Sequence, residues 1–250
     1  MGGNMKSWLL MAMALILAVP ANASAQNASE EEWKALKSVY AKRADNASHV
    51  QAAKEAAALA DKYPEDRKAQ LFCAMTSYYA AHRQKDSKKK EKIAKAGVKC
   101  AKRVLKADKS DYEGRYWWAM TYAKSKEAEG IAKLAEKSVQ VKKYLEKMIS
   151  DQPKRYEGYM MLGALYRDLP KWISWGDPKK GLELLETALE LAPNDPEVLL
   201  EVAAAYAKMG NKEKAAKLYD RCINDSVSPK DKDWETEDAR AYAKKMKAEL

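Results

Sequence analysis

One eleven-residue pattern occurs more than once in this chain, and the distance between its copies limits the folds that the chain can adopt. Residues 112–122 begin with Tyr-Glu-Gly and end in tyrosine, and residues 156–166 do the same 44 positions later. Residues 74–76 repeat the Ala-Met-Thr of residues 119–121, and residues 199–206 are a further copy. Each copy combines a large residue, an adjacent small residue and a nearby aromatic residue, which predicts helices that a neighbouring helix can approach closely.

A second kind of segment alternates with the first. Residues 180–193 form an amphipathic pattern that ends in proline, and residues 51–64, 96–109 and 140–153 repeat it. The chain is therefore predicted to form helix pairs that recur about every 40–45 residues, which is typical of a solenoid. The composition agrees, since 10 glycines, 8 prolines and one phenylalanine accompany abundant alanine, lysine and leucine. That balance favours helices over a β-sandwich or a barrel.

These pairs resemble tetratricopeptide (TPR) repeats, most clearly at the C-terminal end. The matching residues of the last pair are Leu199, Val202, Ala203, Tyr206, Gly210, Ala215 and Tyr219. The matching residues of the preceding pair are Tyr159, Leu162, Gly163, Tyr166, Ala188 and Pro193. That pair has six extra residues between Gly163 and Gly176, and the first two pairs contain lysine-rich insertions at residues 84–95 and 124–137. The resemblance covers residues 31–224.

The predicted fold is an all-α solenoid of about four TPR-like helix pairs. A leading helix is expected near residues 31–43 and a capping helix near residues 236–250. We expect one domain over residues 26–250, in which residues 155–195 and 196–229 are the best-matching repeats.

Three features also resemble the TPR-like T-component of bacterial TRAP transporters: long loops between helices, the joint at residues 169–177 and an export signal. That resemblance implies a scaffold that docks with a solute-binding protein and helps to deliver substrate. The joint contains Trp172 and Trp175, for which both a packing role and a binding role stay open.

The N-terminus has the pattern of a secretory signal peptide over residues 1–25. Lys6 precedes an apolar run at residues 8–19, and Ala23-Ser24-Ala25 supplies the small residues of a cleavage site. The run is too short to span a bilayer, and no later stretch has membrane length. We therefore expect an exported protein, periplasmic or secreted, that does not span a membrane.

The formal net charge of +10 is unevenly distributed. Residues 83–154 contain 21 basic and 10 acidic groups, and most of the basic groups are lysines. Nucleic-acid binding would favour arginine and a recognised module, so no nucleic-acid partner is expected. A solvated helical surface is the favoured interpretation, with an acidic partner or a membrane surface as the alternative.

Catalytic and metal-binding patterns are not found, so we predict a protein that is not an enzyme and has no cofactor. His49 and His82 have no ligand-like spacing and are predicted to lie at the surface. Cys73 and Cys100 are expected in neighbouring antiparallel helices, and whether they are free or form a disulfide, which would add about 3–4 kcal/mol, stays open at this point. Cys222 is expected to be a buried free thiol.

The TPR resemblance implies a concave groove lined by one face of the first helix of each pair. The groove residues carried over by position are Leu71, Met75, Tyr78, Tyr116, Met120, Met160, Arg167 and Leu200. Methionine adapts to varied apolar ligands, so this strip is predicted to hold a hydrophobic helix or an acyl-like molecule. In the alternative, the inserted segments fold back and bury the strip as core.

The leading functional hypothesis is a non-enzymatic exported TPR scaffold that binds a protein partner, such as the solute-binding protein of a transport system. The alternative is a carrier of a small hydrophobic molecule or lipid in the cell envelope. If the groove is a binding surface, replacing Met120 and Met160 by glutamate should abolish capture and leave the melting temperature nearly unchanged.

Overall fold

The computed structural model describes residues 27–229 and 232–250, and the expected signal peptide at residues 1–25 lies outside this part of the chain. Over the described residues the chain forms eleven α-helices and no β-strand, which confirms the all-α prediction. None of these helices is both long and apolar enough to cross a membrane.

The helices follow one another with short connections. They are α1 (Glu30–Ala41), α2 (Asn46–Lys62), α3 (Arg67–His82), α4 (Ser87–Ala107), α5 (Tyr112–Ala128), α6 (Ile131–Asp151), α7 (Tyr156–Asp168), α8 (Pro178–Leu191), α9 (Pro196–Lys208), α10 (Lys212–Asn224) and α11 (Asp233–Ala248). Most of them begin at a serine, aspartate or asparagine whose side chain accepts a hydrogen bond from the first turn, which fixes where the helix starts. These capping residues are Ser29, Asp45, Asp66, Asp86, Asp111, Asp177, Asp195 and Asn211.

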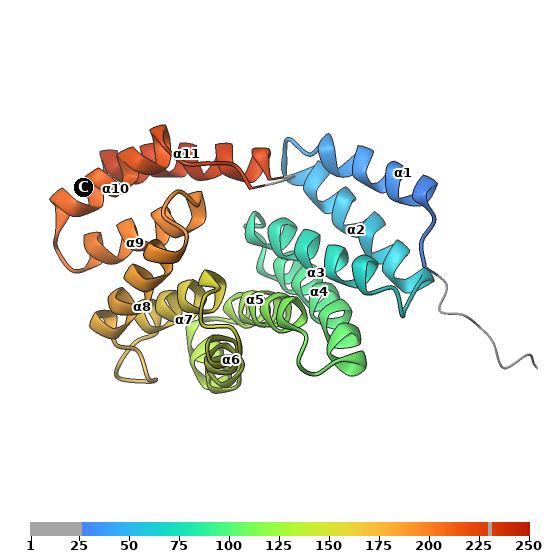
Figure 1. The fold of residues 1–250 in the computed structure, drawn as a ribbon, viewed down its shortest axis with the longest axis horizontal. Coiled ribbons are helices and arrows are strands. Elements are labelled where there is room, and N and C mark those ends of the chain that lie inside the picture. The colour runs from blue at the N-terminus through green and yellow to red at the C-terminus, as the bar shows by residue number, and fades with distance from the viewer. Residues whose placement is uncertain (1–26, 230–231) are drawn as a thin grey trace, which may run out of the picture.

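Consecutive helices pack in pairs as predicted. α3 packs on α4, α5 on α6, α7 on α8 and α9 on α10. The predicted leading helix is α1, and it packs on α2 to form a further pair at the N-terminus. The pairs follow a strongly curved path, and α11 lies across the open side of the curve between the two ends (Figure 1).

The long loops expected between helices do not form at the lysine-rich insertions, residues 84–95 and 124–137. α4 begins at Ser87, α5 continues to Ala128 and α6 begins at Ile131, so the lysine-rich insertions lengthen helices. Lysine, glutamate and alanine are good helix formers and therefore continue the neighbouring helices. Gly130, at φ 109°, interrupts the second insertion because this backbone conformation favours glycine.

Small residues allow close helix approach at α7 and α8. A Cβ atom on Gly163 would lie 2.7 Å from Cγ of Leu185 and 2.8 Å from the carbonyl oxygen of Gly181. Any side chain at Gly163 would therefore push the two helices apart, as the repeated large-small pattern predicts.

The core consists of two apolar clusters. One cluster joins buried residues of α1 to α7, and the other joins buried residues of α7 to α11. The clusters meet at α7, which contributes Met161 to the first and Met160 to the second. The core therefore runs continuously along the curve of helix pairs, as in other solenoids.

Candidate functional site

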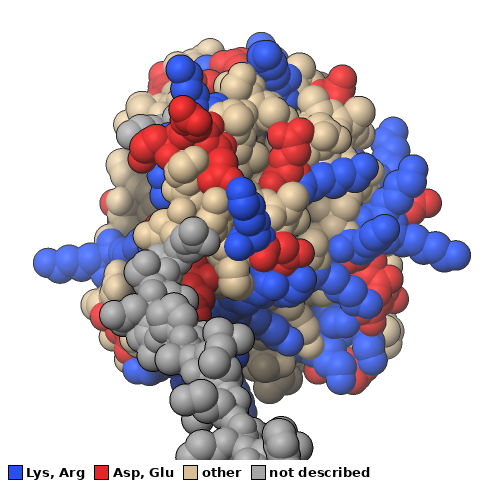
Figure 2. Space-filling model, turned by 90° about the vertical axis from the view of Figure 1, so that its right-hand side faces the viewer, with Lys and Arg blue, Asp and Glu red and all other residues tan. Residues whose placement is uncertain are grey.

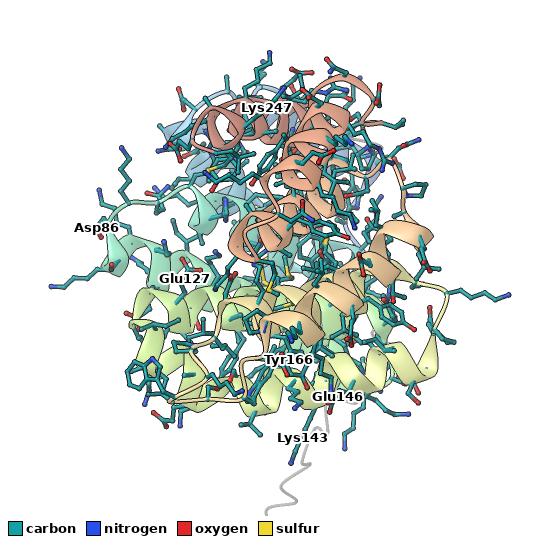
Figure 3. All side chains as sticks on the ribbon, turned by 90° about the vertical axis from the view of Figure 1, so that its left-hand side faces the viewer. Asp86, Glu127, Lys143, Glu146, Tyr166 and Lys247 are labelled. Atoms are coloured by element: carbon teal, nitrogen blue, oxygen red, sulfur yellow. A yellow bond between two sulfur atoms is a disulfide. The ribbon has the colours of Figure 1, made fainter. Side chains whose placement is uncertain are left out.

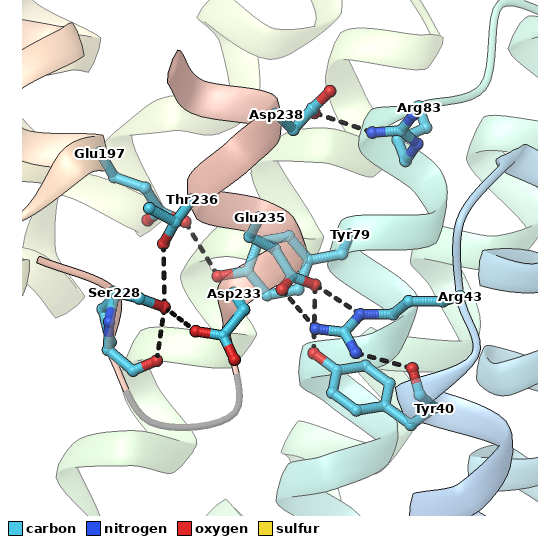
Figure 4. A network of polar contacts seen from close by, with 11 residues as sticks. Tyr40, Arg43, Tyr79, Arg83, Glu197, Ser228, Asp233, Glu235, Thr236 and Asp238 are labelled. Atoms are coloured by element: carbon cyan, nitrogen blue, oxygen red, sulfur yellow. Dashed lines mark hydrogen bonds and ion pairs between the residues drawn. The ribbon is translucent and has the colours of Figure 1, made fainter. Parts of the chain in front are cut away.

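The two ends of the solenoid meet through a buried ion pair. Nε of Arg43, which follows α1, donates to Oε1 of Glu235 on α11 at 2.9 Å, and the hydroxyl of Tyr40 donates to the same oxygen at 3.2 Å. Arg43 is 5% exposed and Glu235 is 8% exposed. The Arg43 guanidinium also lies 3.5 Å from the centre of the Tyr40 ring. Figure 4 shows this network, which holds α11 against the N-terminal helices.

A second set of contacts joins α11 to the residues of α2 and to the end of α3. Nη1 of Arg83 lies 2.8 Å from Oδ2 of Asp238, and its guanidinium stands 4.0 Å over the ring of Trp234. The His49 ring meets the same Trp234 ring edge-on at a centroid distance of 4.7 Å. Helices α2 and α3 therefore both contact the first turns of α11.

A third contact crosses the concave side directly. The hydroxyl of Tyr79 on α3 donates to Oε1 of Glu197 on α9 at 2.9 Å. Burial raises the pKa of Glu197 above its ordinary value, although Lys232 and the Tyr79 hydroxyl act in the opposite direction. Burial also raises the pKa of Tyr79, so this hydroxyl stays protonated and remains a donor. The interior of the curve is thus bridged by the protein's own side chains.

The predicted groove residues lie inside this closed curve. The buried members are Tyr116, Met120, Met160 and Arg167, and the half-buried members are Leu71, Met75, Tyr78 and Leu200. They are covered because the first helices pack on one another, α3 on α5, α5 on α7 and α7 on α9. The inserted segments are helical extensions, and Nζ of Lys124 in the second one lies 5.9 Å from the centre of the Tyr78 ring. In this conformation the strip is not an open apolar groove.

Arg167 is held by ion pairs within the protein. Its Nη1 lies 2.6 Å from a carboxylate oxygen of Glu201, and its Nη2 lies 2.6 Å from Oδ2 of Asp168. These carboxylates raise the pKa of Arg167 although burial opposes them. Its guanidinium therefore ties α7 to α9.

The two tryptophans of the joint have different surroundings. Nε1 of Trp175 donates to Oγ of Ser138 at 2.9 Å, and its ring meets the Tyr166 ring edge-on at 4.6 Å. Tyr166, whose ring Trp175 contacts, is labelled in Figure 3. Trp172 is 83% exposed. The structure does not bring the two side chains into a common site, and Trp175 fastens the joint onto α6.

Cys73 on α3 and Cys100 on α4 form a disulfide, with their Cα atoms 6.2 Å apart. The bridge closes a loop of 27 residues, for which chain entropy gives about 3–4 kcal/mol of stabilisation. Cys222 is a buried free thiol whose pKa burial raises to about 11.

The prediction that His49 lies at the surface is wrong, whereas His82 is exposed. His49 is only 3% exposed because α11 covers it. Its Nε2 has no hydrogen-bond partner among the described residues. Burial, together with the positive charges of Arg83 and Arg43, lowers the pKa of His49 to about 4, although Glu235 and Asp238 act in the opposite direction.

This burial predicts a loss of stability in mild acid. The unfolded chain protonates the His49 imidazole near pH 6.5 and the folded chain only near pH 4, so His49 by itself should lower the free energy of unfolding by about 3 kcal/mol between these values. Urea titrations from pH 7 to pH 4 measure the fall. A His49→Phe variant, which keeps a ring against Trp234, should lose this part of the pH dependence. An unchanged dependence in the variant would contradict the prediction.

A cleft on the outer side of the solenoid was missed by the sequence analysis. α5 packs against both α4 and α6, but α4 and α6 do not pack against each other in the described structure. The cleft between them has a volume of about 490 Å³. Its lining residues are Lys102, Leu105, Lys106, Lys109, Trp118, Tyr122, Gln140 and Tyr144. In the sequence, these residues appear only as lysines that recur in one segment and aromatic residues in the next segments. The same pattern is typical of ordinary amphipathic helices, so it did not indicate a cleft.

Among the described residues, no group of three or more histidine, cysteine, aspartate or glutamate side chains is placed to hold a metal ion. The sequence model of the family described as "Regulator of microtubule dynamics protein 1-3" matches residues 36–169, which is more than half of the chain. The chain belongs to this family. A tetratricopeptide-repeat model matches residues 174–226 and confirms the TPR resemblance of the C-terminal pairs.

The fold of this chain is also similar to solved structures of other proteins. A thermophilic TPR protein, TTC0263 of Thermus thermophilus, is 18% identical with a TM-score of 0.64, over 86% of this chain and 98% of its own. MamA of Desulfovibrio magneticus is 14% identical with a TM-score of 0.47, over 78% and 94% of the two chains. No curated protein matches the sequence significantly. The first structure supports the TPR-like solenoid fold.

Proposed function

We propose that this family member is an exported, non-enzymatic TPR scaffold that binds an acidic surface of a protein partner. TPR-repeat proteins are generally scaffolds for protein interaction rather than enzymes, which supports the general class. The observation that carries the proposal is an excess of unpaired positive charge on the middle helices.

That excess is concentrated on α4 and the residues that follow it. Lys90, Lys95, Lys99 and Arg103 form ion pairs with nearby carboxylates. Six further lysines are exposed and form no ion pair within the described part of the chain. They are Lys88, Lys89, Lys92, Lys102, Lys106 and Lys109. Figure 2 looks at the side that carries α1, α2 and α4, where Lys and Arg side chains stand out from the surface.

Export is supported by two independent features. Residues 1–25 have the composition and order of a secretory signal peptide. The Cys73–Cys100 disulfide fits an oxidising compartment, where such bonds persist. Together they favour the periplasm or the extracellular space as the place of action.

The specific partner that we propose is a solute-binding protein of a transport system, as the resemblance to the TRAP T-component implies. Microtubule dynamics is named in the family description, but an exported protein would meet other partners. The alternative function, carriage of a small hydrophobic molecule, would require the closed curve to open, because Met120 and Met160 are buried.

A cross-linked pull-down from the periplasmic fraction tests the proposal. The expected result is enrichment of an acidic solute-binding protein, with loss of enrichment when the salt concentration is raised. The control bait carries glutamate at the six unpaired lysines and should lose the partner while keeping its helical circular-dichroism signal. Equal capture by the two baits would contradict an acidic partner, and the absence of the protein from both the periplasmic fraction and the culture medium would contradict export.

A further inference from the structure

The α4–α6 cleft has one positively charged wall. Lys102, Lys106 and Lys109 are spaced by four and three residues, so they lie on one face of the helix and its end. All three are exposed and none forms an ion pair among the described residues. None of the described residues that line the cleft carries a carboxylate, so nothing in its wall neutralises this charge.

The floor of the cleft is apolar and aromatic. Leu105 lies below the lysines, and the Trp118 ring stacks on the Tyr122 ring at a centroid distance of 4.8 Å. The Tyr144 ring lies 4.6 Å from the same Trp118 ring. The hydroxyls of Tyr122 and Tyr144 make no hydrogen bond with the described residues, and both can bond to a ligand. The exposed amide of Gln140 adds a donor and an acceptor on the α6 side.

We infer that the α4–α6 cleft binds an extended acidic peptide segment that places one apolar side chain on the aromatic floor. This inference rests on the proposed function, because it names the part of the surface that an acidic protein partner contacts. The volume of about 490 Å³ accommodates a few residues rather than a folded domain.

The spacing of the charges fits an extended chain. Lys102 and Lys106 are about 6 Å apart along the helix axis, at about 1.5 Å for each residue. Alternate side chains of an extended peptide are separated by about 6.8 Å and lie on one side of it. Two acidic residues in alternate positions can therefore face these two lysines at once, and a third can reach Lys109.

The aromatic floor favours a peptide over single-stranded nucleic acid. Stacking of bases requires an open aromatic face. Trp118 is only 3% exposed, since Tyr122 and Tyr144 lie against its ring. The half-buried Tyr122 and Tyr144 and the exposed Gln140 remain accessible, and they suit contact with an apolar side chain and hydrogen bonds with a peptide backbone.

Fluorescence anisotropy with a labelled synthetic peptide tests the inference on the purified mature protein. The probe alternates glutamate with valine around one central tryptophan, which makes it acidic, extended and apolar at one point. We expect saturable binding at low salt that weakens as salt rises. The same peptide with glutamine in place of glutamate should bind at least about tenfold more weakly, because it cannot pair with the lysines.

Charge reversal in the cleft is the decisive variant. Lys102→Glu, Lys106→Glu and Lys109→Glu together should weaken probe binding by at least about tenfold, since each attraction becomes a repulsion. Tyr144→Ala should also weaken binding, and it changes no charge. Circular dichroism verifies that both variants stay folded.

A matched control lies on the same helix. Lys88→Glu, Lys89→Glu and Lys92→Glu make the same change in net charge at exposed, unpaired positions outside the cleft. This control should bind the probe nearly as the native protein does. An equal loss in the two charge variants would overturn the cleft in favour of general electrostatics, and so would failure of the native protein to bind the probe.

Further outcomes test the class of ligand and separate the cleft assignment from the proposed function. A single-stranded oligonucleotide that displaces the probe and is lost in the cleft variant would overturn the assignment to peptides. If the variant with glutamate at Lys102, Lys106 and Lys109 still captures the pull-down partner, the cleft is not the binding site, and the proposed function is still supported. If the probe binds in the cleft but no partner is ever captured, peptide binding in the cleft is supported and the proposed function is contradicted.

Discussion

Replacing Met120 and Met160 by glutamate is expected to unfold the protein at physiological temperature. The two side chains are 7% and 4% exposed, in separate apolar clusters. Burying an unpaired carboxyl group there and losing the apolar contacts should cost about 4 kcal/mol at each position. Because the clusters are distinct, the two costs should add to about 8 kcal/mol, which is comparable with the stability of a whole domain.

Thermal melts followed by circular dichroism measure this effect in the two single variants and the double variant. Met209→Glu is the matched control, because Met209 is 41% exposed and its replacement should change stability by about 0.5 kcal/mol or less. A double variant that melts with the native protein would show that the strip is a surface after all. The groove expected from the TPR resemblance would then be restored as the binding site.

Replacing Glu235 by alanine is expected to release α11 from the N-terminal helices. The substitution leaves the buried Arg43 guanidinium without the carboxylate that Nε contacts at 2.9 Å, and breaking a buried pair in this way costs about 3–5 kcal/mol. The cost can be relieved if the first turns of α11 move away and water reaches Arg43. We therefore expect a lower melting temperature together with a larger radius of gyration in small-angle scattering.

Glu237→Ala is the control for this prediction. Glu237 lies two residues further along α11, is 69% exposed at its side chain, and pairs with Arg240 on the same helix. Its replacement should change neither the melting temperature nor the radius of gyration measurably. Identical behaviour of the two variants would mean that the Arg43–Glu235 pair does not hold the ends together.

The sequence predicted the helical elements well because their signals are local. Alternating amphipathic segments, prolines at the ends and the small residue at Gly163 all act within one helix pair. The same locality explains why the lysine-rich insertions were misjudged. They were compared with the length of a TPR repeat, whereas their own composition favours helix and extends α4, α5 and α6.

The candidate sites were predicted less well, because burial depends on which helices face each other. A position-by-position transfer from TPR repeats placed Tyr116 and Met120 on a concave face, and the structure packs both between neighbouring helices. His49 has polar neighbours in the sequence, yet it is covered by Trp234, which lies far along the chain. The α4–α6 cleft combines residues from three helices, so the sequence of any one segment does not predict it.

The sequence by itself determined the all-α class, the pairing of consecutive helices and the concentration of lysine in the middle of the chain. Only the tertiary structure decided that the two ends meet, through Arg43 and Glu235, which are 192 residues apart. The physical reason is that each helix pair contacts mainly its neighbours, so its own sequence fixes only a small rotation relative to the next pair. Closure depends on the sum of all these rotations, and that sum exists only in the assembled chain.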